Sequence, residues 1–348
     1  MLRKLIITFL SGCLFIVLAV ALLFWMQHEV LKQPLQLDAE QVLNVPVGST
    51  PSGLLLQLEE QGVLRGALWL RLSWRLQGHV QPLHAGEYQL DPAMNVAQLL
   101  NKWRTGDVVR HRITLVEGWN FRQVRAALAQ HAVLQHTLAE VSDSALMRQL
   151  DQANVHPEGQ FFPDTYNFVR GQSDLDILRQ AHQRLQTVLA EEWAQRAEDL
   201  PYRSPYEALI MASIIEKETG VAHERDEIAG VFMRRLAIGM LLQTDPTVIY
   251  GMGERYTGKI TRADLRRPSA YNTYVISGLP PTPIAMVGRE AIYAALHPKP
   301  GKSLYFVARG DGSHVFSNSL AEHNKAVREY QLKRRADYRS SPATKPTQ

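Results

Sequence analysis

The first hydrophobic block of the chain is long enough to cross a membrane. Residues 5–26 contain no charged side chain, and they follow Arg3 and Lys4. A helix of about 20 apolar residues spans the hydrocarbon core of a bilayer, and basic residues before it favour a cytoplasmic amino terminus. A cleavable export signal would have a shorter apolar stretch followed by small residues. The pattern therefore predicts an uncleaved single-pass helix, with residues 1–4 in the cytoplasm and the rest exported.

Short strands then alternate with turns and with helices that have one apolar face. In two places a strand, a glycine or proline turn and a capping residue precede apolar residues at helical spacing. These apolar residues are Leu54, Leu55 and Leu58, and Val96, Leu99 and Leu100. We expect residues 27–42 to form a short polar stalk and residues 43–112 to form a small α/β module.

The remainder of the chain has the pattern of a larger domain with long helices and short strands. Three segments with apolar positions at helical spacing are expected to be helices: 179–199, 205–219 and 223–240. After Gly253, aromatic-rich stretches such as 305–307 alternate with proline and glycine turns, which is typical of strands and loops. We expect an α+β fold over 113–330, with the active site on loops around one helix. Residues 331–348, rich in Lys and Arg and then in Ser, Pro and Thr, are expected to be disordered.

The composition is that of a globular protein with an excess of positive charge. The chain has 348 residues, of which 45% are hydrophobic and 21% charged, and a net charge of +4. Its pI is about 9.1. This balance suits an anionic partner such as a membrane surface or a cell-wall polymer. No run of Lys and Arg indicates nucleic-acid binding.

The chain has one cysteine, Cys13, so the exported part is expected to contain no intramolecular disulfide. The segment Leu10-Ser11-Gly12-Cys13 resembles a lipoprotein signal. However, an apolar run follows Cys13, where a lipidated protein would have a polar tether. The length of the apolar block favours the membrane-spanning interpretation.

Glu216 is the strongest candidate for acid chemistry. It follows segment 209–215, in which six of seven residues are apolar, and burial of this kind keeps a carboxyl group protonated near neutral pH. The small residues Ala212 and Ser213 leave room for a ligand on the same helix face. Glu218 lies roughly 200° further around the helix, so the two carboxylates are not expected to reach the same bond. Alternatively, both are ordinary charges at a helix end.

Side chains suited to sugar binding follow this helix. Tyrosines offer flat apolar faces with polar tips, and amides and hydroxyls can bind N-acetyl and hydroxyl groups. The candidate substrate-binding residues are Gln243, Thr244, Asp245, Tyr250, Tyr271, Asn272 and Tyr274. Packing alone is an alternative for each of them. Asp245 either points into the cleft as a base or stabilises its own Thr-Asp-Pro turn.

The histidines do not have the spacing of a metal site. His223-Glu224 resembles the start of a zinc-protease helix, but Glu227 stands where the second histidine is required. Three later histidines are too far apart in sequence to suggest a site: His297, His314 and His323. The sequence has no nucleotide-binding loop, so neither a metal nor another cofactor is expected.

A long and specific motif occupies residues 212–256: ASIIEKETGVAHERDEIAGVFMRRLAIGMLLQTDPTVIYGMGERY. Further blocks follow the same pattern: Glu158-Gly159, Phe162-Pro163-Asp164-Thr165-Tyr166, Tyr271-Asn272-Thr273-Tyr274, Gly278-Leu279-Pro280-Pro281 and Tyr305-Phe306-Val307. From the apolar block to about residue 330, the chain resembles the MltG/YceG-like family of endolytic murein transglycosylases. One departure is Thr282, where the family often has glycine. This difference affects the conformation expected for the loop and does not affect the expected chemistry.

The resemblance implies a lytic transglycosylase that needs no cofactor. The family's catalytic glutamate is the first acid of the Glu-Lys-Glu triplet, which corresponds to Glu216. A single carboxyl group suffices, because it protonates the glycosidic oxygen and then takes a proton from the 6-hydroxyl of the same muramyl sugar. That hydroxyl closes a 1,6-anhydro ring.

The resemblance also implies where the protein acts. It implies a LysM-like module over 43–112, a catalytic domain over 113–330 in the periplasm, and an anchor in the inner membrane. The substrate would be the MurNAc-GlcNAc bond in nascent peptidoglycan strands, and the cut would end strand elongation. Peptidoglycan synthases (penicillin-binding proteins) are the expected partners.

Two other functions stay open. A muramidase would use Asp245 as a second carboxylate and would leave a reducing end instead of an anhydro end. A wall-binding scaffold that positions synthases is less consistent with the sequence, because a scaffold needs no acid such as Glu216 on an apolar helix.

Overall fold

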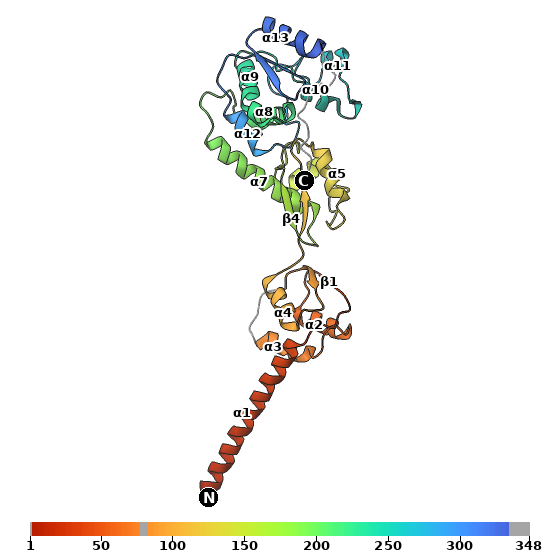
Figure 1. Cartoon of the computed structure of the whole chain (residues 1–348), viewed down its shortest axis with the longest axis vertical. Helices are drawn as coiled ribbons and strands as arrows, with labels where there is room; N and C mark the ends of the chain where they lie inside the picture. The colour runs from red at the N-terminus through yellow and green to blue at the C-terminus, as the bar shows by residue number, and fades with distance from the viewer. Residues whose placement is uncertain (1, 77–82, 334–348) are drawn as a thin grey trace. The chain divides into compact units, whose positions relative to one another are not determined.

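The computed structural model shows two compact units, each with its own hydrophobic core (Figure 1). It describes residues 2–76 and 83–333, so residues 334–348, most of the tail expected to be disordered, lie outside the described residues. Unit 1 comprises residues 1–111, 133–135 and 167–172, and unit 2 comprises residues 112–132, 136–166 and 173–348.

Unit 1 begins with a long apolar helix, α1 (Leu2–Lys32), which is long and apolar enough to cross a membrane. The helix continues past residue 26, and Val30 and Leu31 pack against the core of unit 1. Leu35, just after the helix, is 3% exposed. The stretch 27–42, expected to be a polar stalk, is therefore part of the folded unit, because its apolar side chains are buried in a core.

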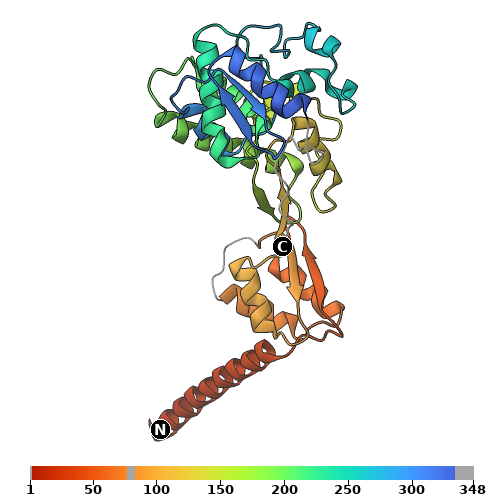
Figure 2. The same cartoon turned by 45° about the horizontal axis from the view of Figure 1, so that its top comes forward.

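The rest of unit 1 has the order strand, helix, helix, strand, helix. In chain order these elements are β1 (Gln41–Val45), α2 (Pro51–Glu60), α3 (Ala67–Leu76), β2 (Gly86–Leu90) and α4 (Val96–Thr105). β1 and β2 pair antiparallel, with Val45 opposite Gly86. Figure 2 shows this pair next to the helices of unit 1, and their apolar faces bury Leu55, Tyr88 and Trp103.

From residue 111 onwards the elements are β3 (His111–Thr114), α5 (Phe121–Gln130), α6 (Asp143–Gln149), β4 (Thr165–Phe168), α7 (Asp174–Ala194), α8 (Pro205–Glu218), α9 (Arg225–Ala237), α10 (Asp245–Met252), α11 (Arg262–Arg266), α12 (Arg289–Leu296), β5 (Tyr305–Ala308), β6 (His314–Ser317) and α13 (Leu320–Val327). β3 pairs with β4, and β5 pairs antiparallel with β6. α8 is the central helix: residues 208–215 are all buried, and α7, α9, α10 and α12 contact it.

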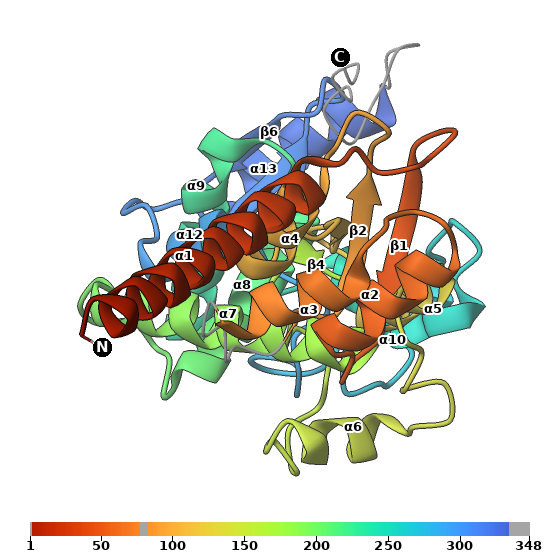
Figure 3. The same cartoon turned by 90° about the horizontal axis from the view of Figure 1, so that it is seen from below.

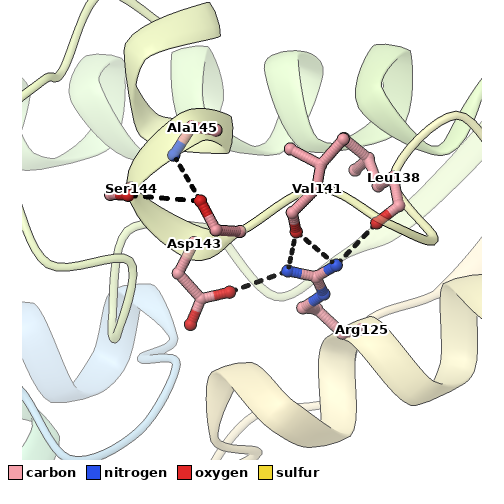
Figure 4. Close-up of polar contacts among 7 residues, drawn as sticks. Arg125, Leu138, Val141, Asp143, Ser144 and Ala145 are labelled. Carbon is pink, nitrogen blue, oxygen red and sulfur yellow. Dashed lines mark hydrogen bonds and ion pairs between the residues drawn. The ribbon is translucent and has the colours of Figure 1, made fainter.

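One arginine holds the connection between α5 and α6 (Figure 4). Arg125 Nη1 donates to Val141 O at 2.9 Å and to Asp143 Oδ1 at 2.7 Å, and Nη2 donates to Leu138 O at 2.7 Å. The planar guanidinium presents several donors in a fixed geometry, so one side chain can bind several carbonyl groups. The connection is thereby ordered without secondary structure of its own.

The mixture of helix and sheet is confirmed, and the three long helices expected in unit 2 correspond to α7, α8 and α9. The region after Gly253 has more helix than expected. The sequence pattern did not predict α12, because most of its side chains are buried. The buried residues are Ala291, Ile292, Ala294, Ala295 and Leu296. A helix buried on most sides shows no apolar stripe, which is the feature that sequence patterns detect.

Candidate active site at the end of helix α8

The small residues before Glu216 are covered by the protein itself. Ala212 and Ser213 are fully buried. Ser213 Oγ accepts a hydrogen bond from Ile284 N at 3.0 Å and donates one to Ile210 O at 2.7 Å. The expectation of ligand space on this face is therefore wrong: the small side chains instead allow the segment before α12 to approach α8 closely.

Glu216 lies near the start of α12. Its Oε2 accepts a hydrogen bond from Gly288 N, the N-cap residue of that helix, at 3.2 Å. Burial raises the pKa of Glu216 and the nearby Glu117 raises it further, whereas Gly288 N–H and Arg225 lower it. The site is crowded, since a Cβ atom at Gly288 would lie 2.0 Å from Glu117 Oε1.

Glu218 has a different set of neighbours. Its Oε1 accepts a hydrogen bond from Thr244 Oγ1, just before α10. Burial raises the pKa of Glu218 to about 7; Asp245 also raises it, and the Thr244 hydroxyl and Arg235 oppose the rise. A carboxyl group with this pKa is about half protonated at neutral pH, so a large share of molecules can donate a proton to a leaving group.

Several of the expected substrate-binding residues lie around Glu218. Thr244 N donates to Thr273 Oγ1 at 3.0 Å, and Tyr274 Oη donates to Asp245 Oδ1 at 2.7 Å. Asp245 is exposed and begins α10, so the expected turn is the start of a helix. Gln243 is also exposed, with a φ of 52° that is uncommon for a residue with a side chain. Carboxyl, hydroxyl and phenol groups therefore lie close together at the end of α8.

Tyr250 and Tyr271 belong to a second group, which lines a cleft of about 760 Å³. Their rings meet edge to face with centroids 4.8 Å apart, and Tyr271 Oη lies 2.9 Å from Thr282 Oγ1. Thr282, the departure from the family pattern, is thus hydrogen-bonded to the cleft wall. Lys217, between the two glutamates of α8, also lines the cleft. The cleft therefore extends to the end of α8.

Glu158, which also lines this cleft, is a buried acid that the sequence did not single out. It is 3% exposed, and Phe121 N donates to both of its carboxylate oxygens, at 3.0 and 3.2 Å. Burial raises the pKa of Glu158 to about 7, while hydrogen bonds from Phe121 N and Tyr250 lower it. The only signal in the sequence was the Glu158-Gly159 pair. Gly159 has a φ of 74°, and a Cβ atom there would lie 2.4 Å from Pro283 Cβ.

Known proteins are similar to this chain over most of its length. The model of the YceG-like family matches residues 43–329. The chain belongs to the YceG-like family. An endolytic murein transglycosylase of Bacillus subtilis (strain 168) is 32% identical over 324 residues, which cover 86% of this chain and 88% of the relative. An endolytic murein transglycosylase of Streptococcus pneumoniae D39 is 24% identical over 322 residues, covering 83% of this chain but 58% of the longer relative.

The crystal structure of a yceG-like protein from Listeria monocytogenes is also similar to this YceG-like chain. It is 32% identical, with a TM-score of 0.52, and the match covers 82% of this chain and 98% of that one. Both the sequence and the fold of this chain are therefore similar to those of YceG-like proteins.

Asn272 has a structural position in this YceG-like chain. It is 2% exposed, and its Nδ2 donates to the carbonyl oxygens of Asp264, Leu265 and Arg267. Its Oδ1 accepts from Tyr274 N at 3.0 Å. The side-chain amide of Asn272, expected to bind substrate, therefore makes these hydrogen bonds within the loop that carries Tyr274.

The histidines considered as metal ligands make separate contacts. Among residues 2–76 and 83–333, no group of three His, Cys, Asp or Glu side chains could hold a metal ion. Glu224 pairs with the buried His314, with Nδ1 2.7 Å from Oε2. His297 stacks on Tyr293, and His323 stacks on Tyr305.

Proposed function

We propose that this YceG-like protein is an endolytic lytic transglycosylase of peptidoglycan. The observation that carries the proposal is Glu218, a carboxyl group with a pKa of about 7 next to hydroxyl and carboxylate side chains at the end of α8. Curated relatives that align with most of the chain are named endolytic murein transglycosylases. An acid that keeps its proton at neutral pH is what glycosidic bond cleavage requires.

We place the catalytic acid at Glu218 instead of Glu216, the residue expected from the sequence. The small-residue face before Glu216 is filled by the segment that carries Ile284, whereas Glu218 adjoins the exposed Asp245 and the half-buried Tyr274. The pKa of Glu218 rises to about 7. Substitution of each glutamate in turn distinguishes this assignment from the one expected from the sequence.

In the proposed reaction, Glu218 donates its proton to the glycosidic oxygen between MurNAc and GlcNAc, and the bond from C1 to this oxygen breaks. The Glu218 carboxylate then accepts the proton of the 6-hydroxyl of the same MurNAc, whose oxygen bonds to C1. The product is a 1,6-anhydro-MurNAc end, and Glu218 is protonated again. One carboxyl group acts as acid and then as base.

Mass spectrometry of products from uncrosslinked glycan strands tests this proposal. We expect 1,6-anhydro-MurNAc ends, formed by cuts inside the strands. Reducing ends would instead support a muramidase in which Asp245, which adjoins Glu218, activates water. In that case Asp245→Asn would abolish activity. Intact strands at all enzyme concentrations would favour a wall-binding scaffold.

The rate of cleavage is expected to fall as the pH rises through about 7, because Glu218 must be protonated to act as the acid. Thr244→Val removes a hydrogen bond that stabilises the Glu218 carboxylate, so the pKa of Glu218 should rise. The descending limb of the plot of rate against pH should then move to higher pH. Asp245→Asn removes a negative charge that favours the protonated form, so the limb should move to lower pH. Initial rates of anhydro-end formation across the neutral range measure both shifts.

An unchanged limb in both variants would mean that another group sets the pH dependence. Glu158 is the first alternative, because its pKa is also raised to about 7. Glu158→Gln would then remove the limb while Thr244→Val and Asp245→Asn left it in place.

We further propose that α1 anchors the protein in the inner membrane, with the amino terminus in the cytoplasm and unit 2 in the periplasm. The support is the length of α1 and the basic residues before its apolar stretch. An enzyme held there would cut nascent strands and end their elongation, next to penicillin-binding proteins.

Residues 43–112 are proposed to form a LysM-like module that contacts glycan, on the basis of their strand, helix, helix, strand order. A spacer is the alternative function for unit 1, since small α/β modules serve many purposes.

A further inference from the structure

The exposed apolar part of α1 ends where the helix reaches the core of unit 1. Residues 6–25 of α1 are exposed, apart from the half-buried residue 19, whereas Met26 and Gln27 are half-buried. Twenty helical residues span about 30 Å, which equals the usual thickness of the hydrocarbon core. If α1 crosses the membrane, the part of unit 1 that follows residue 25 therefore starts at the membrane surface.

Helix α3 is attached to α1 at this same level. Gln27 Nε2 donates to Ser73 Oγ on α3 at 2.7 Å. Just before α3, Gln33 Nε2 donates to Arg65 O at 2.6 Å, and Arg65 N donates to Gln33 Oε1 at 3.2 Å. Figure 3 shows α1, α3 and α4 from below, and both α3 and α4 contact α1. The position of α3 relative to the membrane is therefore set by α1.

The face of α3 that points away from the core is apolar and basic. Ala67 and Leu70 face the core and are 0% and 1% exposed, whereas Leu68 and Leu72 are 71% and 48% exposed. A spacing of four residues places Leu68 and Leu72 on one side of the helix. The sequence of α3, ALWLRLSWRL, contains two arginines, Arg71 and Arg75, and no acidic residue.

We propose that α3 lies in the surface of the lipid bilayer. Leu68 and Leu72 enter the boundary between headgroups and acyl chains, and Arg71 and Arg75 bind lipid phosphates. Apolar residues on one side of a basic helix are the pattern of helices that lie in this boundary, and arginine matches phosphate geometry. The inference rests on the proposed membrane crossing by α1.

A lipid partner explains these observations better than a protein partner does. Exposed leucines alone would be equally suited to a protein contact. Here, however, the Gln27–Ser73 hydrogen bond fixes α3 next to the end of the apolar span, and a bilayer surface is present at that level in every molecule. The positive charge of α3 matches the negative surface of anionic phospholipids.

The test uses spin labels on the full chain in nanodiscs of phosphatidylethanolamine and phosphatidylglycerol, with one chain per disc. Labels are attached after Leu68→Cys or Leu72→Cys in a Cys13→Ser background, and at native Cys13 in the parent chain. Control labels follow Val42→Cys and Val47→Cys, exposed apolar positions of the same unit (56% and 83%). Each label's collision rate with oxygen, which concentrates in the bilayer, is compared with its collision rate with a water-soluble nickel chelate.

We expect the ratio of oxygen to nickel collisions at residues 68 and 72 to exceed that at residues 42 and 47 several-fold. If the labels at 68 and 72 match the controls while the label at Cys13 is shielded from nickel, α3 does not lie in the bilayer although α1 crosses it. If the label at Cys13 is itself accessible to nickel, the membrane crossing fails, and the inference about α3 fails with it. The two failures are therefore distinguishable.

Discussion

Glu218→Gln is expected to abolish cleavage while leaving the fold and sugar binding intact. The amide keeps the size of the side chain and can still accept the hydrogen bond from Thr244 Oγ1, but it has no proton to donate to the glycosidic oxygen. General acid–base catalysis contributes roughly 10²–10⁴-fold, and here one group would perform both proton transfers. The measurement is the rate of anhydro-end formation from uncrosslinked glycan by the full chain in detergent.

Glu216→Gln is the matched control, because it makes the same chemical change two residues away on the same helix. Glutamine retains an oxygen that can accept the hydrogen bond from Gly288 N, so we expect activity within about tenfold of the parent. If Glu216→Gln abolished cleavage and Glu218→Gln did not, Glu216 would be the acid, as the sequence alone suggested. Unchanged activity in both variants would exclude this helix end as the source of the acid.

Phe232→Ala is expected to lower the free energy of unfolding of unit 2 by about 3–5 kcal/mol, the usual cost of removing a buried phenyl ring. Phe232 is 1% exposed on α9 and meets Phe306 of β5 edge to face, with ring centroids 5.7 Å apart. The cavity would loosen the packing of α9, which carries Arg235, one of the charged groups near Glu218. Hydrogen exchange of peptides from α8 and α9 measures the loss of stability within unit 2, independently of unit 1.

Ile238→Ala provides the control for Phe232→Ala. Ile238 directly follows α9 and is 64% exposed, so its truncation should leave hydrogen exchange nearly unchanged, as is usual for surface substitutions. Equal losses of exchange protection in Phe232→Ala and Ile238→Ala would mean that the packing of α9 does not stabilise the core of unit 2. A loss of exchange protection confined to α9 would mean that α8 is stable without it.

Several features of the protein were determined by the sequence itself. The uncharged stretch 5–26 is enough to predict a long apolar helix, and the apolar run 209–215 is enough to predict a buried helix that ends in acidic residues. These predictions succeed because hydrophobic spacing and capping residues act within a few turns of one helix. The separation of Glu216 from Glu218 by helix geometry is also a local property. Their different neighbours in the structure agree with it.

Only the tertiary structure decided what surrounds each carboxyl group. Glu218 obtains its hydrogen bond from Thr244, 26 residues away, and Glu158 obtains its own from Phe121, 37 residues away. Ala212 and Ser213 were expected to leave ligand space, but Ile284, 71 residues beyond Ser213, fills that face of α8. Burial and pKa depend on such long-range contacts, because desolvation is set by every segment that packs around a group. The local pattern therefore determined which helix carries Glu216 and Glu218, and the packing of distant segments determined the surroundings and the pKa of each acid.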